Sequence, residues 1–296
     1  MSSPHIPVLL EEVLQRLDIH PGDIVVDGTL GFAGHAYEMA KALQNEGQFI
    51  GIDQDPEAIL FSQQKLSAFQ NSQLITDNYS NLPHILDHLG VPKVNKLLLD
   101  IGVSSWQIDQ AKRGFSFQKD GPLDMRMSPK NPKSAQTILA TYSAEELLAV
   151  FKNYGELYPA QTLVKNIVEW RKTTPFFTTT DLTRVIKKSF YFNNQRAKMM
   201  KTFAQVFQAL RIEVNQELDV LTHVLKILPD RIAIQGRVAI ITFHSLEDRI
   251  VKQFFKAHKT AFKSVGSKLK PSYHDAKDNP RARSAVLRVY ERVMDE

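Results

Sequence analysis

The sequence predicts an α/β fold, a doubly wound and mostly parallel sheet that carries an inserted helical domain. Over residues 23–105, short and nearly continuous apolar runs alternate with amphipathic segments, which is typical of buried parallel strands joined by helices. Residues 106–202 replace this alternation with loop-like and helix-like segments, and the apolar run GRVAIITF then resumes the strand pattern. We therefore expect a discontinuous sheet domain over 1–105 and 203–296, with a helical insertion over 106–202.

The individual elements follow from the periodicity of each segment. Strands are expected at 23–27, 48–53, 73–78 and 95–102 and from Gly236 onward, with helices between the first four at 36–43, 57–66 and 82–89. Helices are also expected at 143–154, 160–172, 181–190, where Thr180 is the N-cap, and 210–228. Residues 284–293 alternate between two faces, with Leu287 and Val289 opposite Arg288, which predicts a final antiparallel strand.

Composition restricts the class of protein. With 43% apolar and 23% charged residues, the chain of 296 residues is typical of a globular protein. The absence of cysteine excludes a disulfide framework, thiolate metal sites and a cysteine nucleophile, and no metal site is expected. Glu11 and Glu12 interrupt the N-terminal apolar run, so we expect no signal peptide, no membrane span and a cytoplasmic location. The net charge of +5 fits either an anionic partner or a generally basic surface.

The segment IVVDGTLGFAGHA predicts a cofactor loop. A strand that ends in Asp27, followed by Gly28, Gly31 and Gly34 and then a helix, is typical of a turn that binds a polar or anionic ligand. Asp53 ends the next strand, at the spacing where a carboxylate meets ribose hydroxyls. The loop lacks the G-x-G-x-x-G pattern of dinucleotide sites, which favours S-adenosylmethionine over NAD. A purely structural glycine turn is the alternative.

The third and fourth strands end in further candidate residues. Asp77 and Tyr79 follow the third strand, either to hold and stack on an adenine or as an ordinary polar loop. Asp100 and Ser104 follow the fourth strand, and Gln107 comes three residues later. Asp100 is either a helix cap or a ligand-binding group, and its place beside the first strand favours ligand binding.

Two further segments allow two interpretations each. His244 follows the strand that starts at Gly236, and it either contacts substrate and transfers a proton or caps a helix through its neighbours. In the segment GPLDMRM, Asp124 and Arg126 are either an ion pair inside a folded loop or contacts to a flipped nucleotide.

Nine motifs together resemble the bacterial ribosomal RNA small subunit methyltransferase H family, the 16S rRNA cytosine-N4 methyltransferases. They run in order from His5 nearly to Arg292: HIPVLLEEV, DGTLGFAGH, GIDQDP, DIGVSSWQID, RGFSF, DGPLDMRM, FQALRIEVNQEL, FHSLEDRIVK and NPRARSAVLRVYER. The resemblance implies a class I SAM-dependent methyltransferase fold, Rossmann-like, with an inserted helical substrate-recognition domain. It also implies transfer of methyl from S-adenosylmethionine to the N4 amine of a decoding-centre cytidine in 16S rRNA of the small ribosomal subunit.

The resemblance also assigns site residues. The family's cofactor contacts fall on Ala33, Gly34, His35, Asp53, Tyr79, Asp100 and Gln107. The sequence departs from the family at Phe32-Ala33, where a smaller, glycine-rich pair is usual, at Trp106, where proline is usual, and at 201–205, which lack the His-Pro-Ala lead. For the amine chemistry, the Pro-Pro-aromatic turn of many amino-methyltransferases is missing, and we take Asp100, Ser104 and His244 as the catalytic candidates.

Basic residues interleaved with aromatic ones predict an RNA contact in the insertion. Lys187, Lys188, Arg196 and Lys198 flank the aromatic run 190–192, and a plain solvated surface is the alternative. The competing functions are an RNA-binding or ribosome-assembly factor that no longer holds cofactor and a nicotinamide-dependent oxidoreductase. The expected partner is 16S rRNA in the small subunit, and a homodimer stays a hypothesis because the sequence predicts no oligomeric state.

Overall fold

The computed structural model describes residues 7–294 and divides the chain into two compact units. The sheet unit comprises Met1–Gly102 and Leu218–Glu296, and the helical unit comprises Val103–Glu217. The predicted first boundary lies three residues further along the chain than the observed one (105 against 102). The predicted second boundary, after residue 202, is wrong because it falls inside α10 (Arg196–Asn215), which buries Phe203 and Phe207 in the core of the helical unit.

The described part of the sheet unit forms one seven-stranded sheet in the order β3-β2-β1-β4-β5-β7-β6. The strands are β1 (Ile24–Asp27), β2 (Gln48–Asp53), β3 (Ser72–Thr76), β4 (Val94–Asp100), β5 (Ile232–Thr242), β6 (Phe262–Ser264) and β7 (Val286–Arg292). The first five strands are parallel, and β7 runs antiparallel to β5 and β6. This arrangement confirms the predicted doubly wound sheet with an antiparallel last strand. The strand order reverses between β1 and β4, where open α/β sheets bind ligands at the carboxyl ends of their strands.

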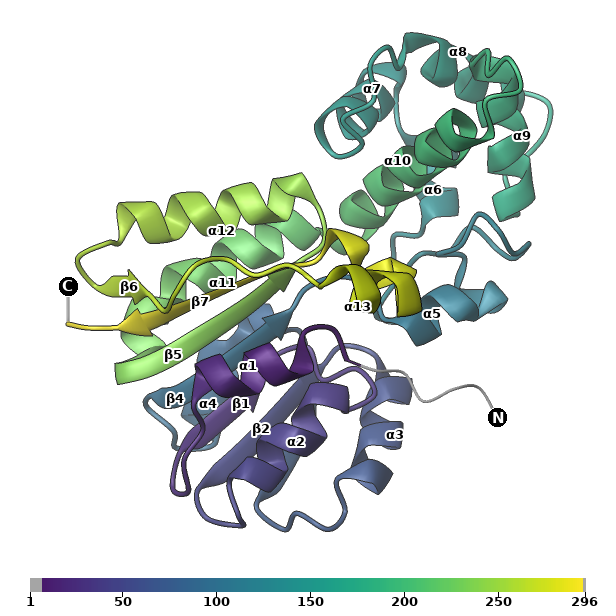
Figure 1. The fold of residues 1–296 in the computed structure, drawn as a ribbon. Helices are drawn as coiled ribbons and strands as arrows, with labels where there is room; N and C mark the ends of the chain where they lie inside the picture. The colour runs from purple at the N-terminus through teal and green to yellow at the C-terminus, as the bar shows by residue number, and fades with distance from the viewer. Residues whose placement is uncertain (1–6, 295–296) are drawn as a thin grey trace. The chain divides into compact units, whose positions relative to one another are not determined.

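Helices cover both faces of this sheet (Figure 1). Leu17, Met39 and Ile59 bring one set of helices onto one face, and Leu86, Leu225 and Phe255 bring the other set onto the opposite face. The first set is α1 (Leu10–Leu17), α2 (Gly34–Ala42) and α3 (Pro56–Lys65); the second is α4 (Leu82–His88), α11 (Glu217–Arg231) and α12 (Ser245–Ala257). Both faces are therefore buried, which explains the nearly continuous apolar strands.

Several element boundaries differ from the prediction. β5 begins at Ile232 rather than at Gly236, with a register shift in its pairing to β4 between Val94 and Lys96. β6 was not predicted, because three residues carry no usable alternation. The first helix, α1, begins at Leu10 within the motif HIPVLLEEV, of which residues 5–6 lie outside the described residues. A short helix, α13 (Tyr273–Asp278), and the 3-10 turns η1 (Tyr79–Asn81) and η3 (Pro280–Ser284) complete the sheet unit.

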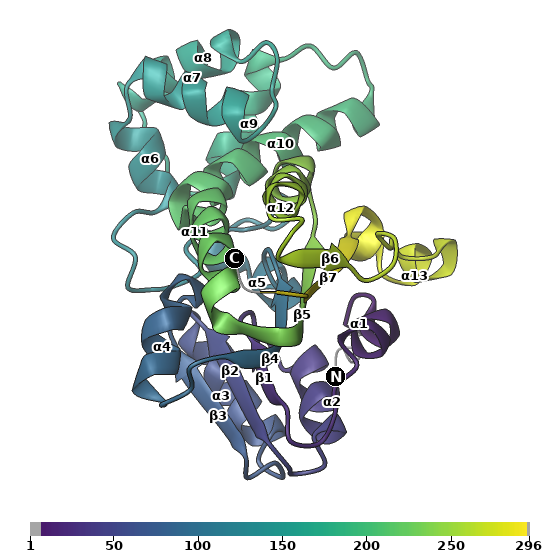
Figure 2. The same cartoon turned by 90° about the vertical axis from the view of Figure 1, so that its left-hand side faces the viewer.

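The helical unit packs around its own apolar core. Its helices are α5 (Ser105–Asp109), η2 (Ala111–Arg113), α6 (Ala135–Thr141), α7 (Ala144–Asn153), α8 (Gln161–Arg171), α9 (Thr179–Ser189) and α10, and Figure 2 shows α6 to α10 gathered together. The N-cap of α9 is Thr178, not the predicted Thr180, because the hydroxyl of Thr178 and the carboxylate of Asp181 form a reciprocal capping box. Among residues 7–294, no helix combines the length and the apolar character that a membrane span requires.

Candidate functional site

The loop between β1 and α2 has glycines where a larger residue would clash or would be strained. A Cβ on Gly28 would lie 2.6 Å from Leu99 Cδ2 and 3.3 Å from Tyr79 Cβ. Gly31 has a φ of +50°, in the left-handed region that favours glycine. Ala33, the N-cap of α2, has a φ of +52°, which costs a non-glycine residue about 1 kcal/mol. The loop thus makes a tight turn and begins α2 at the carboxyl end of β1, where a helix N-terminus favours a polar or anionic group.

Asp53, the predicted ribose carboxylate, holds this turn. Its Oδ2 accepts a hydrogen bond of 2.8 Å from the backbone N–H of Gly31, and its Oδ1 accepts one of 2.8 Å from Asp55 N–H. The end of β2 is therefore tied directly to the glycine loop. A carboxylate oxygen can accept more than one hydrogen bond, so holding the loop is compatible with binding hydroxyl groups of a ligand.

Tyr79 begins the turn η1 after β3 and is half-buried beside Gly28. Asp77 is engaged in the loop itself, because its Oδ1 accepts hydrogen bonds from Asn78 N–H and from the side-chain amide of Asn81. The polar-loop interpretation therefore describes Asp77, whereas Tyr79 lies at the carboxyl end of the sheet, next to the glycine loop.

Asp27 and Asp100 end the neighbouring strands β1 and β4, and the pKa values of both carboxyls lie well above the usual range of aspartate. Burial raises the pKa of Asp27 to about 7, although Thr29 donates hydrogen bonds to its carboxylate. Burial, together with the negative charges of Asp27 and Glu247, raises the pKa of Asp100 to about 8. Among the described residues, no group hydrogen-bonds to the buried Oδ1 of Asp100. The two carboxyls thus titrate near neutrality, and a cation bound beside them would favour their ionised forms.

His35 connects this pair of carboxyls to the N-terminal segment. The ring is 6% exposed, and its Nε2 donates to the carbonyl oxygen of Val8 at 3.0 Å. Nδ1 then faces Asp100, with 3.7 Å between it and Oδ2. The first turn of α2 thereby places His35 and Asp100, both predicted cofactor residues, beside each other.

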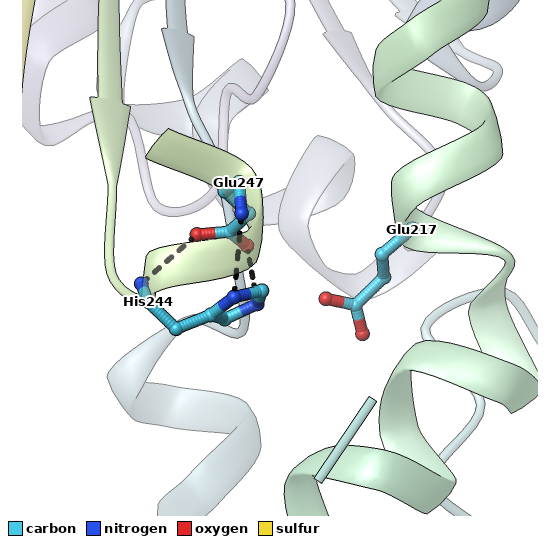
Figure 3. Close-up of side chains that lie close together, drawn as sticks. All are labelled: Glu217, His244 and Glu247. Carbon is cyan, nitrogen blue, oxygen red and sulfur yellow. Dashed lines mark hydrogen bonds and ion pairs between the residues drawn. The ribbon is translucent and has the colours of Figure 1, made fainter. Parts of the chain in front are cut away.

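His244 is the N-cap of α12, as the structural alternative predicted. The Glu247 carboxylate accepts a hydrogen bond from Phe243 N–H. It also accepts one from His244 N–H, while His244 Nδ1 receives Glu247 N–H in return (Figure 3). His244 Nε2 lies 3.0 Å from Glu247 Oε1, and the Glu247 side chain is fully buried. The next residue, Asp248, pairs not with a neighbour but with Arg288 on β7 at 2.7 Å. His244 therefore fixes Glu247, one of the charges that raise the pKa of Asp100.

Ser104 and Gln107, assigned to the helical unit, cap each other. The Ser104 hydroxyl accepts from Gln107 N–H at 3.2 Å, and Gln107 Oε1 accepts from Ser104 N–H at 3.1 Å. This capping box starts α5, in which Trp106 carries the basic groups of Lys112 and Arg113 over its ring at 5.9 Å. The pattern S-x-x-Q is a recognised capping signal, and it accounts for the contacts between these two residues.

Asp124 and Arg126 form an ion pair inside a folded loop, which was the first of their two predicted interpretations. The Arg126 guanidinium donates from Nε and Nη2 to the two Asp124 oxygens at 2.8 and 2.9 Å, and Nη1 reaches the carbonyl of Asn131. Asn215 then binds Met127 N–H and the carbonyl of Met125 through its side chain. These contacts fold the loop onto the end of α10, so they account for both residues without a nucleotide.

The predicted RNA-contacting cations are exposed on α9 and α10. Lys187 and Lys188 lie in the last turn of α9, and Arg196 and Lys198 lie in the first turn of α10. Within residues 7–294, none of the four has an acidic partner within 4 Å, so their charges are uncompensated locally. The aromatic side chains between these cations are only partly exposed to a ligand.

The aromatic run between these cations divides into core and surface. Phe190 and Phe192 pack against the core of the helical unit, and Phe192 contacts Phe203 with 6.5 Å between ring centroids. Tyr191, by contrast, is 83% exposed. One aromatic side chain of the three is therefore free to stack on a base.

Sheet order, glycine loop and strand-end acids together define the class I methyltransferases that use S-adenosylmethionine. The family model described as the MraW methylase family matches residues 2–293, so the chain belongs to that family. This membership confirms the predicted family, fold class and cofactor, S-adenosylmethionine.

Individual relatives agree with the family match over nearly their whole length. A protein of Lachnospira eligens named "Ribosomal RNA small subunit methyltransferase H" is 42% identical, with 99% of both chains covered. A protein of the same name from Dictyoglomus thermophilum is 43% identical, with 99% of this chain and 98% of the relative covered. A crystal structure described as a putative rRNA-methylase from Clostridium thermocellum matches at a TM-score of 0.50 and 11% identity, covering 99% of each chain. That structure is similar in fold.

Two residues of the site were not predicted. Asp27 was noted as the end of a strand, but its burial beside Asp100 depends on the packing of β1 against β4. Glu247 was not among the predicted site residues, but it completes the capping box of α12 and its charge helps to raise the pKa of Asp100. The motif H-x-x-E at a strand-to-helix junction resembles a capping box and is the signal that identifies Glu247.

Proposed function

We propose that this chain methylates the N4 amine of a specific decoding-centre cytidine in 16S rRNA of the small ribosomal subunit, with S-adenosylmethionine as methyl donor. The match of the MraW methylase family to residues 2–293 carries this proposal. Relatives that are 42% and 43% identical and named for the small-subunit RNA support ribosomal RNA as the substrate. The motifs quoted above support the cytosine N4 position. We further propose that the protein acts in the cytoplasm.

The sheet unit offers the groups that a cationic nucleoside cofactor requires. We assign cofactor binding to Ala33, Gly34, His35, Asp53, Tyr79 and Asp100, with Gln107 assigned from the helical unit. The buried Oδ1 of Asp100, which receives no hydrogen bond among the described residues, and the raised pKa values of Asp27 and Asp100 support this assignment. An ammonium or sulfonium charge would stabilise these carboxylates in their ionised forms. The donor set therefore fits S-adenosylmethionine.

When bound, the cofactor supplies a methyl group attached to a positively charged sulfur. The cytosine amine is a poor nucleophile, because its lone pair is delocalised into the ring. Transfer of this methyl to the amine would form a nitrogen–methyl bond in place of the sulfur–methyl bond, and the electron pair of the broken bond would stay on sulfur. The amine then carries one proton in excess, which must leave to restore a neutral base.

Asp100 is the side chain best suited to handle this proton. In our proposal its ionised carboxylate accepts a hydrogen bond from the amine and receives the proton through Oδ1. Burial raises the pKa of this carboxyl above its usual range, and the positive charge of the bound cofactor would keep it ionised to receive the proton. His244 and Ser104 are the other two catalytic candidates. His244 acts by fixing Glu247, and Ser104 carries the first side-chain hydroxyl after β4.

Lys187, Lys188, Arg196 and Lys198 are the proposed RNA contacts of the helical unit. Their four positive charges are exposed and locally uncompensated, which suits the neutralisation of phosphates. Tyr191, at 83% exposure, offers a flat surface for an unstacked base. We propose that the helical unit is the substrate-recognition domain.

The direct test is transfer of labelled methyl from S-adenosylmethionine to small ribosomal subunits that lack the modification, followed by nucleoside analysis. Label in N4-methylated cytidine is the expected result. No label on any RNA, despite measured cofactor binding, would instead support an RNA-binding or assembly factor. Binding of NADH with no binding of S-adenosylmethionine would support the oxidoreductase alternative.

A further inference from the structure

The glycine loop is held from its outer side by α3, a helix that contributes no predicted cofactor residue. The Ser62 hydroxyl, which is fully buried, donates a hydrogen bond of 3.0 Å to the carbonyl oxygen of Gly31. The Lys65 ammonium donates one of 3.3 Å to the carbonyl oxygen of Phe32. Two side chains one turn apart on the same helix therefore bind two successive carbonyls of the loop.

An aromatic pair adds a third attachment. The rings of Phe32 and Phe61 meet edge to face, with 4.9 Å between their centroids and 60° between their planes. Such a pair contributes more than the burial of its area alone. Phe61 is 46% exposed, so its ring serves this contact rather than the core beneath α3.

These attachments hold the part of the loop whose backbone conformation is energetically unfavourable. Gly31 and Ala33 both have a left-handed φ, and Phe32 lies between them. The N–H of Gly31 binds Asp53 while its carbonyl binds Ser62, so the peptide groups on both sides of the residue are fixed. Without the attachments, the intervening segment would sample other conformations, and its binding-competent fraction would fall.

We propose that Phe61 and Ser62 of α3 are positioning residues that set the cofactor affinity of this chain by holding the loop 31–33 in its binding conformation. The inference rests on the proposed cofactor site. It assigns no contact between α3 and the cofactor, and the effect is transmitted through Phe32 and Gly31. The prediction is therefore a change in affinity for cofactor at an unchanged rate of methyl transfer.

The test measures binding of S-adenosylhomocysteine by titration calorimetry to the full chain and to Phe61→Ala. Loss of the aromatic pair should raise Kd about three- to tenfold. Leu60→Ala is the matched control, because Leu60 is the preceding residue of the same helix and is 62% exposed. Its Kd should stay at the wild-type value. Phe61→Tyr retains the ring edge, and its hydroxyl can extend into solvent from a half-exposed position, so it should restore the affinity.

Kinetics separate positioning from a general loss of structure. With S-adenosylmethionine varied, Phe61→Ala should raise KM by the same factor as Kd and leave kcat and the KM for ribosomal subunits unchanged. Combining Phe61→Ala with Phe32→Ala should raise Kd by less than the product of the two single effects, since both changes remove the same aromatic contact. Equal Kd values for Phe61→Ala, Leu60→Ala and the wild type would overturn the proposal. Failure of the wild type itself to bind would instead count against the proposed function.

Discussion

Replacing Asp100 by asparagine should make the stability of the protein less dependent on pH. A carboxyl whose pKa is raised from 3.8 to about 8 binds more protons in the folded than in the unfolded chain between these values. The contribution of Asp100 to the free energy of unfolding therefore falls as pH rises from about 4 to about 8. Asp100→Asn removes this loss. The asparagine variant should gain stability over the wild type as the solution becomes alkaline.

The size of the effect follows from the shift. A rise of the Asp100 pKa from 3.8 to about 8 corresponds to at most about 5–6 kcal/mol in the free energy of unfolding, at roughly 1.4 kcal/mol per pH unit. One quarter of the Asp100 side chain is exposed, and Asp27 titrates in the same range, so solvent and coupling reduce the value. From pH 4.5 to pH 8.5, the free energy of unfolding of Asp100→Asn should rise by about 2 kcal/mol relative to that of the wild type.

Urea unfolding at the two pH values measures this shift, with the slopes compared to ensure that the same surface unfolds. Asp87→Asn provides a control without this pH dependence, because the hydrogen bond from Arg231 lowers the pKa of Asp87 below its ordinary value of 3.8. That carboxyl is ionised in the folded and the unfolded chain at both pH values, so its replacement should change the free energy of unfolding by a similar amount at pH 4.5 and pH 8.5. A stability difference for Asp100→Asn that is the same at both pH values would refute the reasoning.

Three further predictions test other parts of the site. Asp53→Ala removes the acceptor of the Gly31 and Asp55 amides and should weaken cofactor binding at least tenfold with the fold intact, as seen by calorimetry and circular dichroism; unfolding would show that Asp53 is structural. Lys187→Glu with Lys188→Glu should weaken RNA binding and reduce its salt dependence but leave cofactor affinity unchanged, and an unaltered salt slope would remove both lysines from the interface. His244→Ala should cost about 1 kcal/mol through loss of the cap, while His244→Asn should restore that stability. If the imidazole takes part in catalysis, kcat falls in both variants, whereas full activity of His244→Asn would reduce His244 to a helix cap.

The sequence predicted the strands well where burial on both faces leaves a continuous apolar run. β2 occupies the predicted residues 48–53, because every residue from Phe49 to Ile52 is buried. β5 starts four residues before the predicted Gly236, since its first residue pairs with Val94 across a register shift that no periodicity reveals. The second domain boundary was missed for a related reason, because α10 is one uninterrupted helix and a change in motif content does not end it.

The candidate site shows a similar division between local and long-range information. The glycine loop and Asp53 could be predicted because both lie within one β-α-β segment of fixed spacing. The raised pKa values of Asp27 and Asp100 could not, because they arise mainly from burial where β1 and β4 pack together, and for Asp100 also from a charge on α12, far along the chain. Likewise, Phe190 and Phe192 have the sequence pattern of a nucleic-acid surface, and only the fold places them against the core.

The central claim is tested most directly by mapping the methyl group on the RNA itself. Small subunits lacking the modification would be incubated with S-adenosylmethionine and either the wild-type protein or Asp53→Ala, and the 16S rRNA would then be digested and analysed by mass spectrometry. The account predicts one added methyl, on the N4 amine of one cytidine in the decoding-centre fragment, from the wild type and a strongly reduced yield from the variant. A methyl group on ribose, on ring carbon or on several unrelated fragments would contradict it.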